Sequence, residues 1–238
     1  MLFNSYEFIF AFLPITFFIY FYLNSKRLTV ASKGFLVFAS LFFYSWWNIA
    51  YLPLILISML FNYVVGNSLA KASFENKKGS NKSFSKKSIL IFGIVANLSL
   101  LGYFKYADFF IANFNLVSSS NVNLLHLVLP LAISFFTFQQ IAYLVDSYRC
   151  ETKEYDFLNY ALFVSFFPQL IAGPIVHHKE MMPQFASKWN MVKNYKNIAL
   201  GLFIFSIGLF KKVVIADTFA PWATAGFDTA TTLNLIEA

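Results

Sequence analysis

Polar side chains that could take part in chemistry lie within or beside apolar runs in the middle of this sequence. Gln139 and Gln140 lie inside one run, and His177 and His178 follow a Gly173-Pro174 turn. A hydrocarbon core holds no water, so a buried amide or imidazole there needs a protein partner or a wet cavity. Histidine also titrates near neutral pH and often serves as a general base. We therefore predict that Gln139, Gln140, His177 and His178 support a site or line an internal path.

The polar residues also have structural interpretations. A glutamine in a membrane helix can simply bond to a neighbouring helix. We interpret His126 as an interfacial histidine, and Asp146, Tyr148 and Arg149 as a charged collar that fixes packing. No metal site is predicted, because adjacent histidines point in different directions and the only nearby carboxylate is Glu180.

The composition predicts a membrane protein with several spans. Of the 238 residues, 58% are hydrophobic and 12% are charged, whereas soluble domains carry about 25% charged residues. The apolar residues form runs of membrane length rather than alternating strands, which favours an all-α polytopic helical bundle over a barrel. The predicted spans are residues 8–23, 34–47, 52–70, 89–106, 124–145, 157–172 and 197–216.

The start of the chain predicts a retained first span. No Lys or Arg precedes Lys26, and a small-residue cleavage site is lacking. The single cysteine, Cys150, excludes an internal disulfide. We interpret it as a juxtamembrane thiol, with palmitoylation as the alternative.

Basic residues predict the orientation of the chain. Lys26, Arg27 and Lys33 follow the first span, and residues 71–88 carry six lysines. The turn at residues 48–51 between these loops has no basic residue, so the positive-inside rule places the N-terminus outside and both loops in the cytoplasm. The lysines of 71–88 are read as a topology-setting loop rather than a nucleic-acid or anionic-lipid patch, since no arginine or aromatic cluster accompanies them.

One predicted span is shorter than the hydrocarbon core of a membrane. Residues 157–172 would form a helix of about 24 Å, against about 30 Å of hydrocarbon. Pro168 and the Gly173-Pro174 turn would interrupt that helix. We predict a broken or re-entrant element whose freed carbonyls face protein or water.

No serine triad context, Walker loop or dinucleotide fingerprint is found. Five segments in order nevertheless resemble the bacterial membrane-bound O-acyltransferase family, in its alginate O-acetylation and peptidoglycan O-acetyltransferase branch. They are MLFNSYEFIFAFLPI, YSWWNIAYLPLILISMLFNY, GYFKYADFF, LPLAISFFTFQQIAYLVDSYR and FFPQLIAGPIVHHKEMMPQF. The resemblance extends to about Ala216.

The resemblance implies an inner-membrane enzyme that moves an acyl group, usually acetyl, from a cytoplasmic donor such as acetyl-CoA toward a polysaccharide outside, often through a periplasmic partner. No bound cofactor is expected. The family's catalytic histidine belongs to a later Trp-His segment that does not occur here, so the chain resembles the N-terminal half of one membrane domain, and that histidine is expected beyond Ala238. His177 and His178 match a segment that is not the catalytic motif.

Two other functions stay open from the sequence. A transporter or flippase for an acyl or lipid-linked substrate would use the same internal polar groups without a covalent step. A noncatalytic membrane scaffold would position a partner. A downstream reading frame with the Trp-His segment favours the enzyme.

The lysine distribution generates the first testable prediction. A reporter fused near Lys82 reads cytoplasmic, and one fused near Asn48 reads external. Paired phosphatase and fluorescent-protein fusions measure both positions, and the reverse pattern would overturn the orientation.

Overall fold

The computed structural model describes residues 1–76, 86–151, 156–171, 173, 176, 178–224 and 226. The predicted all-helical class is confirmed, and no strand occurs among these residues. The elements are η1 (Glu7–Phe12), α1 (Leu13–Ser25), α2 (Thr29–Ser45), η2 (Ile49–Tyr51), α3 (Leu52–Asn76), α4 (Lys86–Ser118), α5 (Ile133–Tyr148), α6 (Phe157–Ser165), α7 (Phe167–Leu170), α8 (His178–Ala186), η3 (Lys188–Met191), α9 (Tyr195–Phe210), η4 (Lys211–Ala216) and α10 (Asp217–Thr224).

Four helical stretches in the described part of the chain are long and apolar enough to cross a membrane. They are Glu7–Ser25, Ile49–Lys71, Lys86–Ser118 and Tyr195–Thr224, while Thr29–Ser45 is apolar but shorter. The predicted first span thus forms a helix of spanning length. Helix α3 continues to Asn76 and α4 starts at Lys86, so both ends of the predicted 71–88 loop are helical. Residues 77–85 lie outside the described residues.

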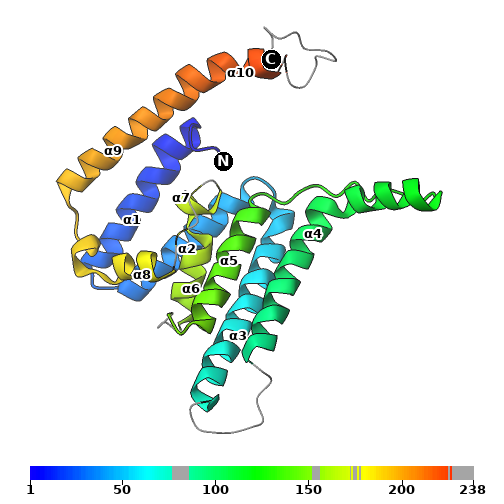
Figure 1. Cartoon of the computed structure of the whole chain (residues 1–238). Helices are drawn as coiled ribbons and strands as arrows, with labels where there is room; N and C mark the ends of the chain where they lie inside the picture. The colour runs from blue at the N-terminus through cyan, green and yellow to red at the C-terminus, as the bar shows by residue number, and fades with distance from the viewer. Residues whose placement is uncertain are drawn as a thin grey trace.

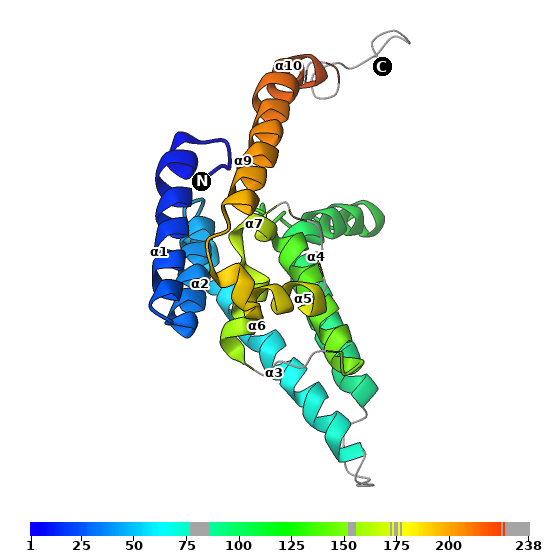
Figure 2. The same cartoon turned by 90° about the vertical axis from the view of Figure 1, so that its left-hand side faces the viewer.

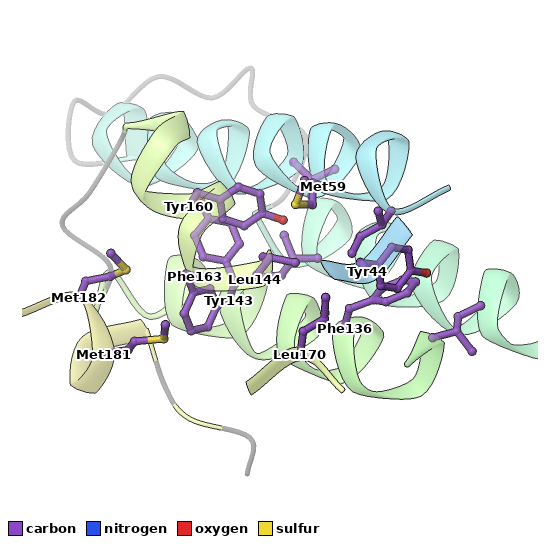
Figure 3. Close-up of a cluster of buried hydrophobic side chains, with 14 of the residues drawn as sticks. Tyr44, Met59, Phe136, Tyr143, Leu144, Tyr160, Phe163, Leu170, Met181 and Met182 are labelled. Atoms are coloured by element: carbon purple, nitrogen blue, oxygen red, sulfur yellow. The ribbon is translucent and has the colours of Figure 1, made fainter. Parts of the chain in front are cut away.

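The central bundle consists of α3, α4 and α5, with α5 packed against both of the others. Figures 1 and 2 show these three helices side by side, and α6 packs against α2 on the flank. Buried side chains of this bundle, together with others from α2 and from α6 to α8, form the larger core cluster, which includes Met59, Phe136, Leu144 and Phe163 (Figure 3). This core positions α5 and α6, which carry the polar residues singled out from the sequence.

A second core cluster is made of phenylalanine rings. Phe167 of α7 lies 5.1 Å from Phe12 and 5.5 Å from Phe43, measured between ring centroids. Phe8 packs on the same rings. Aromatic pairs at such distances contribute about 0.5–1.5 kcal/mol beyond their buried area. The cluster therefore anchors the short helix α7 against η1 and α2.

The predicted span at residues 124–145 is wrong over its first part. Residues 119–130 are not helical, and α5 begins at Ile133. Pro130 lacks an amide donor and disfavours helix at Leu129, and Ala132 has a left-handed φ of 59°. The preceding helix extends to Ser118, well past the predicted end at residue 106.

The predicted span at residues 157–172 is interrupted, as expected from its length and proline content. Helix α6 ends at Ser165, Phe166 has a ψ of 109°, and α7 begins at Phe167 with Pro168 in its first turn. Gly173 is described, but Pro174 lies outside the described residues. A proline in the first turn needs no amide partner, so the break falls just before Pro168.

Close packing in the bundle generates the second prediction. A Cβ at Gly66 would lie 2.6 Å from Cε1 of Tyr143, whose ring is buried. We expect Gly66→Ala to lower stability by about 1–3 kcal/mol, because overpacking forces the ring to move. Thermal unfolding of the purified protein in detergent, followed by circular dichroism, measures the change.

Gly102→Ala is the matched control, since no atom lies within 4 Å of that position. Alanine favours helix over glycine by about 1 kcal/mol, so this variant should be unchanged or more stable. Equal melting temperatures for both variants would contradict the packing argument.

Candidate functional site

At the break between α6 and α7, two buried side chains form hydrogen bonds with backbone groups of the interrupted segment. Gln139 Nε2 donates to the carbonyl oxygen of Phe163 at 2.7 Å. The amide of Phe167 donates to Ser40 Oγ at 3.2 Å. Gln139 and Ser40 are both buried. An unpaired backbone group in hydrocarbon costs several kcal/mol, so these two contacts allow the helix to be interrupted inside the bundle.

Gln140 projects from α5 about 100° around the helix from Gln139, and it joins an amide cluster with residues of α3 and α4. Ser58 Oγ donates to Gln140 Oε1 at 2.7 Å, and Asn62 Nδ2 donates to the same oxygen. Asn62 and Asn97 exchange two hydrogen bonds between their amides, at 2.7 and 3.0 Å. All four side chains are buried. The cluster sets the relative positions of the three central helices.

Gln140 retains unused hydrogen-bonding capacity. Its Nε2 atom has no hydrogen-bond partner among the described residues, and the side chain is fully buried. The same holds for Thr137 Oγ1, one turn earlier on α5. Buried amide donors are normally satisfied by protein or by ordered water.

His178 is buried at the start of α8, with 2% of its surface exposed. Its ring lies 5.1 Å from Phe163 and 5.9 Å from Tyr143, between ring centroids. Figure 3 shows these two rings beside Tyr160, whose ring centroid lies 4.4 Å from that of Tyr143. Within the described residues, His178 Nε2 has no hydrogen-bond partner.

The surroundings of His178 favour its neutral form. Burial lowers the pKa of the imidazole, and the nearby carboxylate of Asp146 partly opposes that shift. Asp146 and His178 are each only 2% exposed. A neutral imidazole can donate one hydrogen bond and accept another.

Two apolar cavities meet at α7. One, of about 500 Å³, is lined by residues of α1, α2, α8 and η3, including Thr16, Tyr20 and Met181. The other, of about 700 Å³, is lined by the N-terminal residues and α9, including Phe3 and Phe205. Leu13, Phe167 and Pro168 line both cavities. The interrupted helix therefore forms a wall shared by two cavities.

The predicted site residues separate into distinct places. Gln139 and His178 are brought together around Phe163, whereas Gln140 faces the amide cluster. His177 lies outside the described residues. His126 is exposed on the non-helical segment, where its backbone amide donates to Asp108. Within the described residues, no group of three or more metal-ligating side chains occurs.

Several polar residues of the site were not singled out from the sequence. Ser40, Ser58, Asn62 and Asn97 each lie within apolar helices, and polar residues in spans are a general signal of internal contacts. The expected collar is also divided: Asp146 is buried near His178, but Arg149 is exposed. Lys86 lies over the Tyr148 ring and within 3.4 Å of Cys150 Sγ.

These features define an integral membrane protein with an internal polar site. The chain has apolar spans, a helix break whose backbone groups bond to side chains, and buried amide and imidazole groups. Residues 144–237 match MBOAT, the membrane-bound O-acyltransferase family. The chain is 52% identical over 264 residues to a peptidoglycan O-acetyltransferase of Helicobacter pylori, in an alignment that covers 100% of this chain and 49% of the relative.

Further relatives are alginate-modifying proteins. The chain is 36% identical over 228 residues to a probable alginate O-acetylase of Pseudomonas aeruginosa, covering 94% of this chain and 41% of that protein. An Azotobacter vinelandii relative of the same name is also 36% identical, covering 94% and 43%. No solved structure matches at a significant level. The chain belongs to the membrane-bound O-acyltransferase family, and it spans about half the length of these relatives.

Burial of His178 generates the third prediction. Because its pKa in the folded protein is lowered, the unfolded chain takes up the proton first as pH falls below about 6.5. Stability is therefore full above that pH and declines as pH falls through it. We expect His178→Gln to lose part of this decline, measured as the difference in melting temperature between pH 7 and pH 5.

His126→Gln is the matched control, because that side chain is exposed and should leave the wild-type pH dependence unchanged. An identical pH dependence in wild type and His178→Gln would show that burial of this imidazole is not linked to folding.

Proposed function

We propose that this chain is the N-terminal part of a bacterial O-acetyltransferase that modifies a cell-surface polysaccharide. The observation that carries the proposal is the 52% identity to a peptidoglycan O-acetyltransferase over the whole chain. The lower identity to alginate O-acetylases favours peptidoglycan as the acceptor. The donor is an acyl thioester such as acetyl-CoA on the cytoplasmic side, and a periplasmic protein passes the group to the glycan.

The distribution of charge supports an inner-membrane protein with its N-terminus outside. Lys26 directly follows α1, and Lys193, just before α9, lies against the same end of α1, with its Nζ 5.8 Å from the centre of the Phe18 ring. The orientation predicted from the first two basic loops did not use Lys188, Lys193 or Lys196. Their position on the same side supports a cytoplasmic assignment for that side.

Attack of an acceptor hydroxyl on the thioester carbonyl breaks the C–S bond, releases the thiol and requires removal of the hydroxyl proton. A positioned base accelerates such a step by roughly 10²–10⁴-fold. We assign that base to the family's histidine beyond Ala238, and we assign to His178 a positioning role. Its ring packs on Phe163, whose carbonyl holds Gln139, so it supports the break at α7 where the two cavities meet.

The fourth prediction compares the 238-residue chain with a longer form that includes the Trp-His segment. With labelled acetyl donor, the periplasmic protein and peptidoglycan fragments, the longer form transfers acetyl groups and the 238-residue chain transfers no measurable amount. Robust turnover by the 238-residue chain would show that its own histidines are catalytic.

In the longer form, His178→Ala and His177→Ala should each reduce transfer partially at unchanged protein level, because the base lies elsewhere. His126→Ala is the control and should keep wild-type transfer. Wild-type transfer in both variants would show that the two histidines have only a packing role. Movement of a lipid-linked substrate without acetyl transfer by the longer form would identify a transporter instead.

A further inference from the structure

Helix α4 is longer than a membrane requires. Its 33 residues extend about 50 Å, whereas the hydrocarbon core is about 30 Å thick. Figures 1 and 2 show that the C-terminal part of α4 turns away from the bundle. We call this part, residues 106–118, together with the returning residues 119–130, the distal arm.

The distal arm uses its polar side chains to hold itself together. Both carboxylate oxygens of Asp108 accept backbone amides of the returning segment, from Leu125 at 2.7 Å and His126 at 3.0 Å. The amide of Asn115 makes two bonds with the backbone of Val122, at 2.8 and 3.0 Å. Asp108 and Asn115 are seven residues apart, so they lie on one face of the helix. The returning backbone covers that face.

The opposite face of the arm is apolar and exposed. Tyr106, Phe110, Phe114 and Val117 follow the spacing of one helical face. Their exposed fractions run from 44% at Tyr106 to 89% at Val117. Two polar residues near this face bond back to the helix itself: Asn113 Nδ2 donates to the Phe109 carbonyl at 2.7 Å, and Ser118 Oγ donates to that of Phe114 at 2.6 Å.

The base of the arm is attached at the level of an aromatic belt. Tyr51 donates its hydroxyl to the Val128 carbonyl at 2.9 Å, and the nearby Trp46 and Trp47 are more than half exposed. Such belts mark the boundary between hydrocarbon and water. Lys105 reaches over the Tyr106 ring at 5.4 Å, and lysines at this depth extend to the head groups.

We propose that the distal arm lies in the plane of the membrane, with its Tyr106–Phe110–Phe114–Val117 face buried in the glycerol and acyl-chain region of the lipid leaflet at that end of the bundle. A helix with one apolar face and satisfied polar groups binds lipid in this manner. The arm thereby widens the contact of the protein with that leaflet and holds α5, which follows it, at a defined depth.

Spin labels on single cysteines test this proposal. Cys150→Ser removes the only native cysteine, after which Phe110→Cys, Phe114→Cys and Val117→Cys each carry a nitroxide in vesicles of phosphatidylethanolamine and phosphatidylglycerol. Collision with oxygen reports lipid, and collision with a water-soluble nickel complex reports solvent. Phe203→Cys on α9 is the lipid reference, and Lys71→Cys, at the boundary of the apolar stretch Ile49–Lys71, is the aqueous reference, since both side chains are exposed.

The arm positions should give an oxygen-to-nickel collision ratio several-fold above that of Lys71→Cys and close to that of Phe203→Cys. Nickel accessibility equal to that of Lys71→Cys would show an arm in water and overturn the proposal. Low collision with both reagents at these positions would show a protein partner on this face and would also overturn it. The positions are exposed, so a sharp size-exclusion peak suffices to show that each variant is folded.

Discussion

The absence of hydrogen-bonding partners in hydrocarbon is the constraint on which this structure depends. An interrupted helix inside a membrane bundle is tolerable only if each freed backbone group finds a partner within the protein. Here Gln139 donates a hydrogen bond to the carbonyl oxygen of Phe163, and Ser40 accepts one from the amide of Phe167. These side chains come from α5 and α2, which both pack against α6, so contacts between helices stabilise the break.

Helix α7, two apolar cavities and His178 all lie next to that break. Helix α7 begins directly after it, and the ring of Phe167 is held by phenylalanines of η1 and α2. The two apolar cavities have α7 as their common wall. His178 packs on Phe163 at the same level. The imidazole of His178, the amide of Gln139 and the two cavities therefore lie in one region around the break.

Buried amides serve a second purpose in this bundle. The reciprocal pair of Asn62 and Asn97, together with Gln140, joins three helices through side chains that are nearly free of solvent. In a bilayer, apolar packing does not distinguish a neighbouring helix from lipid tails, so directional bonds set which helices pair and at what height. Directional bonds also fix the distal arm. Asp108 and Asn115 accept backbone amides of the returning segment, and the aromatic side chains of the arm point outward.

The sequence by itself determined the membrane class, most of the helical runs and the interruption near Pro168. These follow from properties of single residues and short windows: apolar side chains avoid water, and proline lacks an amide donor. It also indicated that Gln139 and Gln140 need internal partners. Only the tertiary structure decided which partners, because Ser40 and Phe167 are 127 residues apart and Gln140 and Asn62 are 78 apart. The non-helical segment before α5 likewise depends on Asp108, which accepts amides 17 and 18 residues later. Hydropathy measures the transfer of one side chain into lipid, and it carries no information about which distant backbone group a polar side chain will meet.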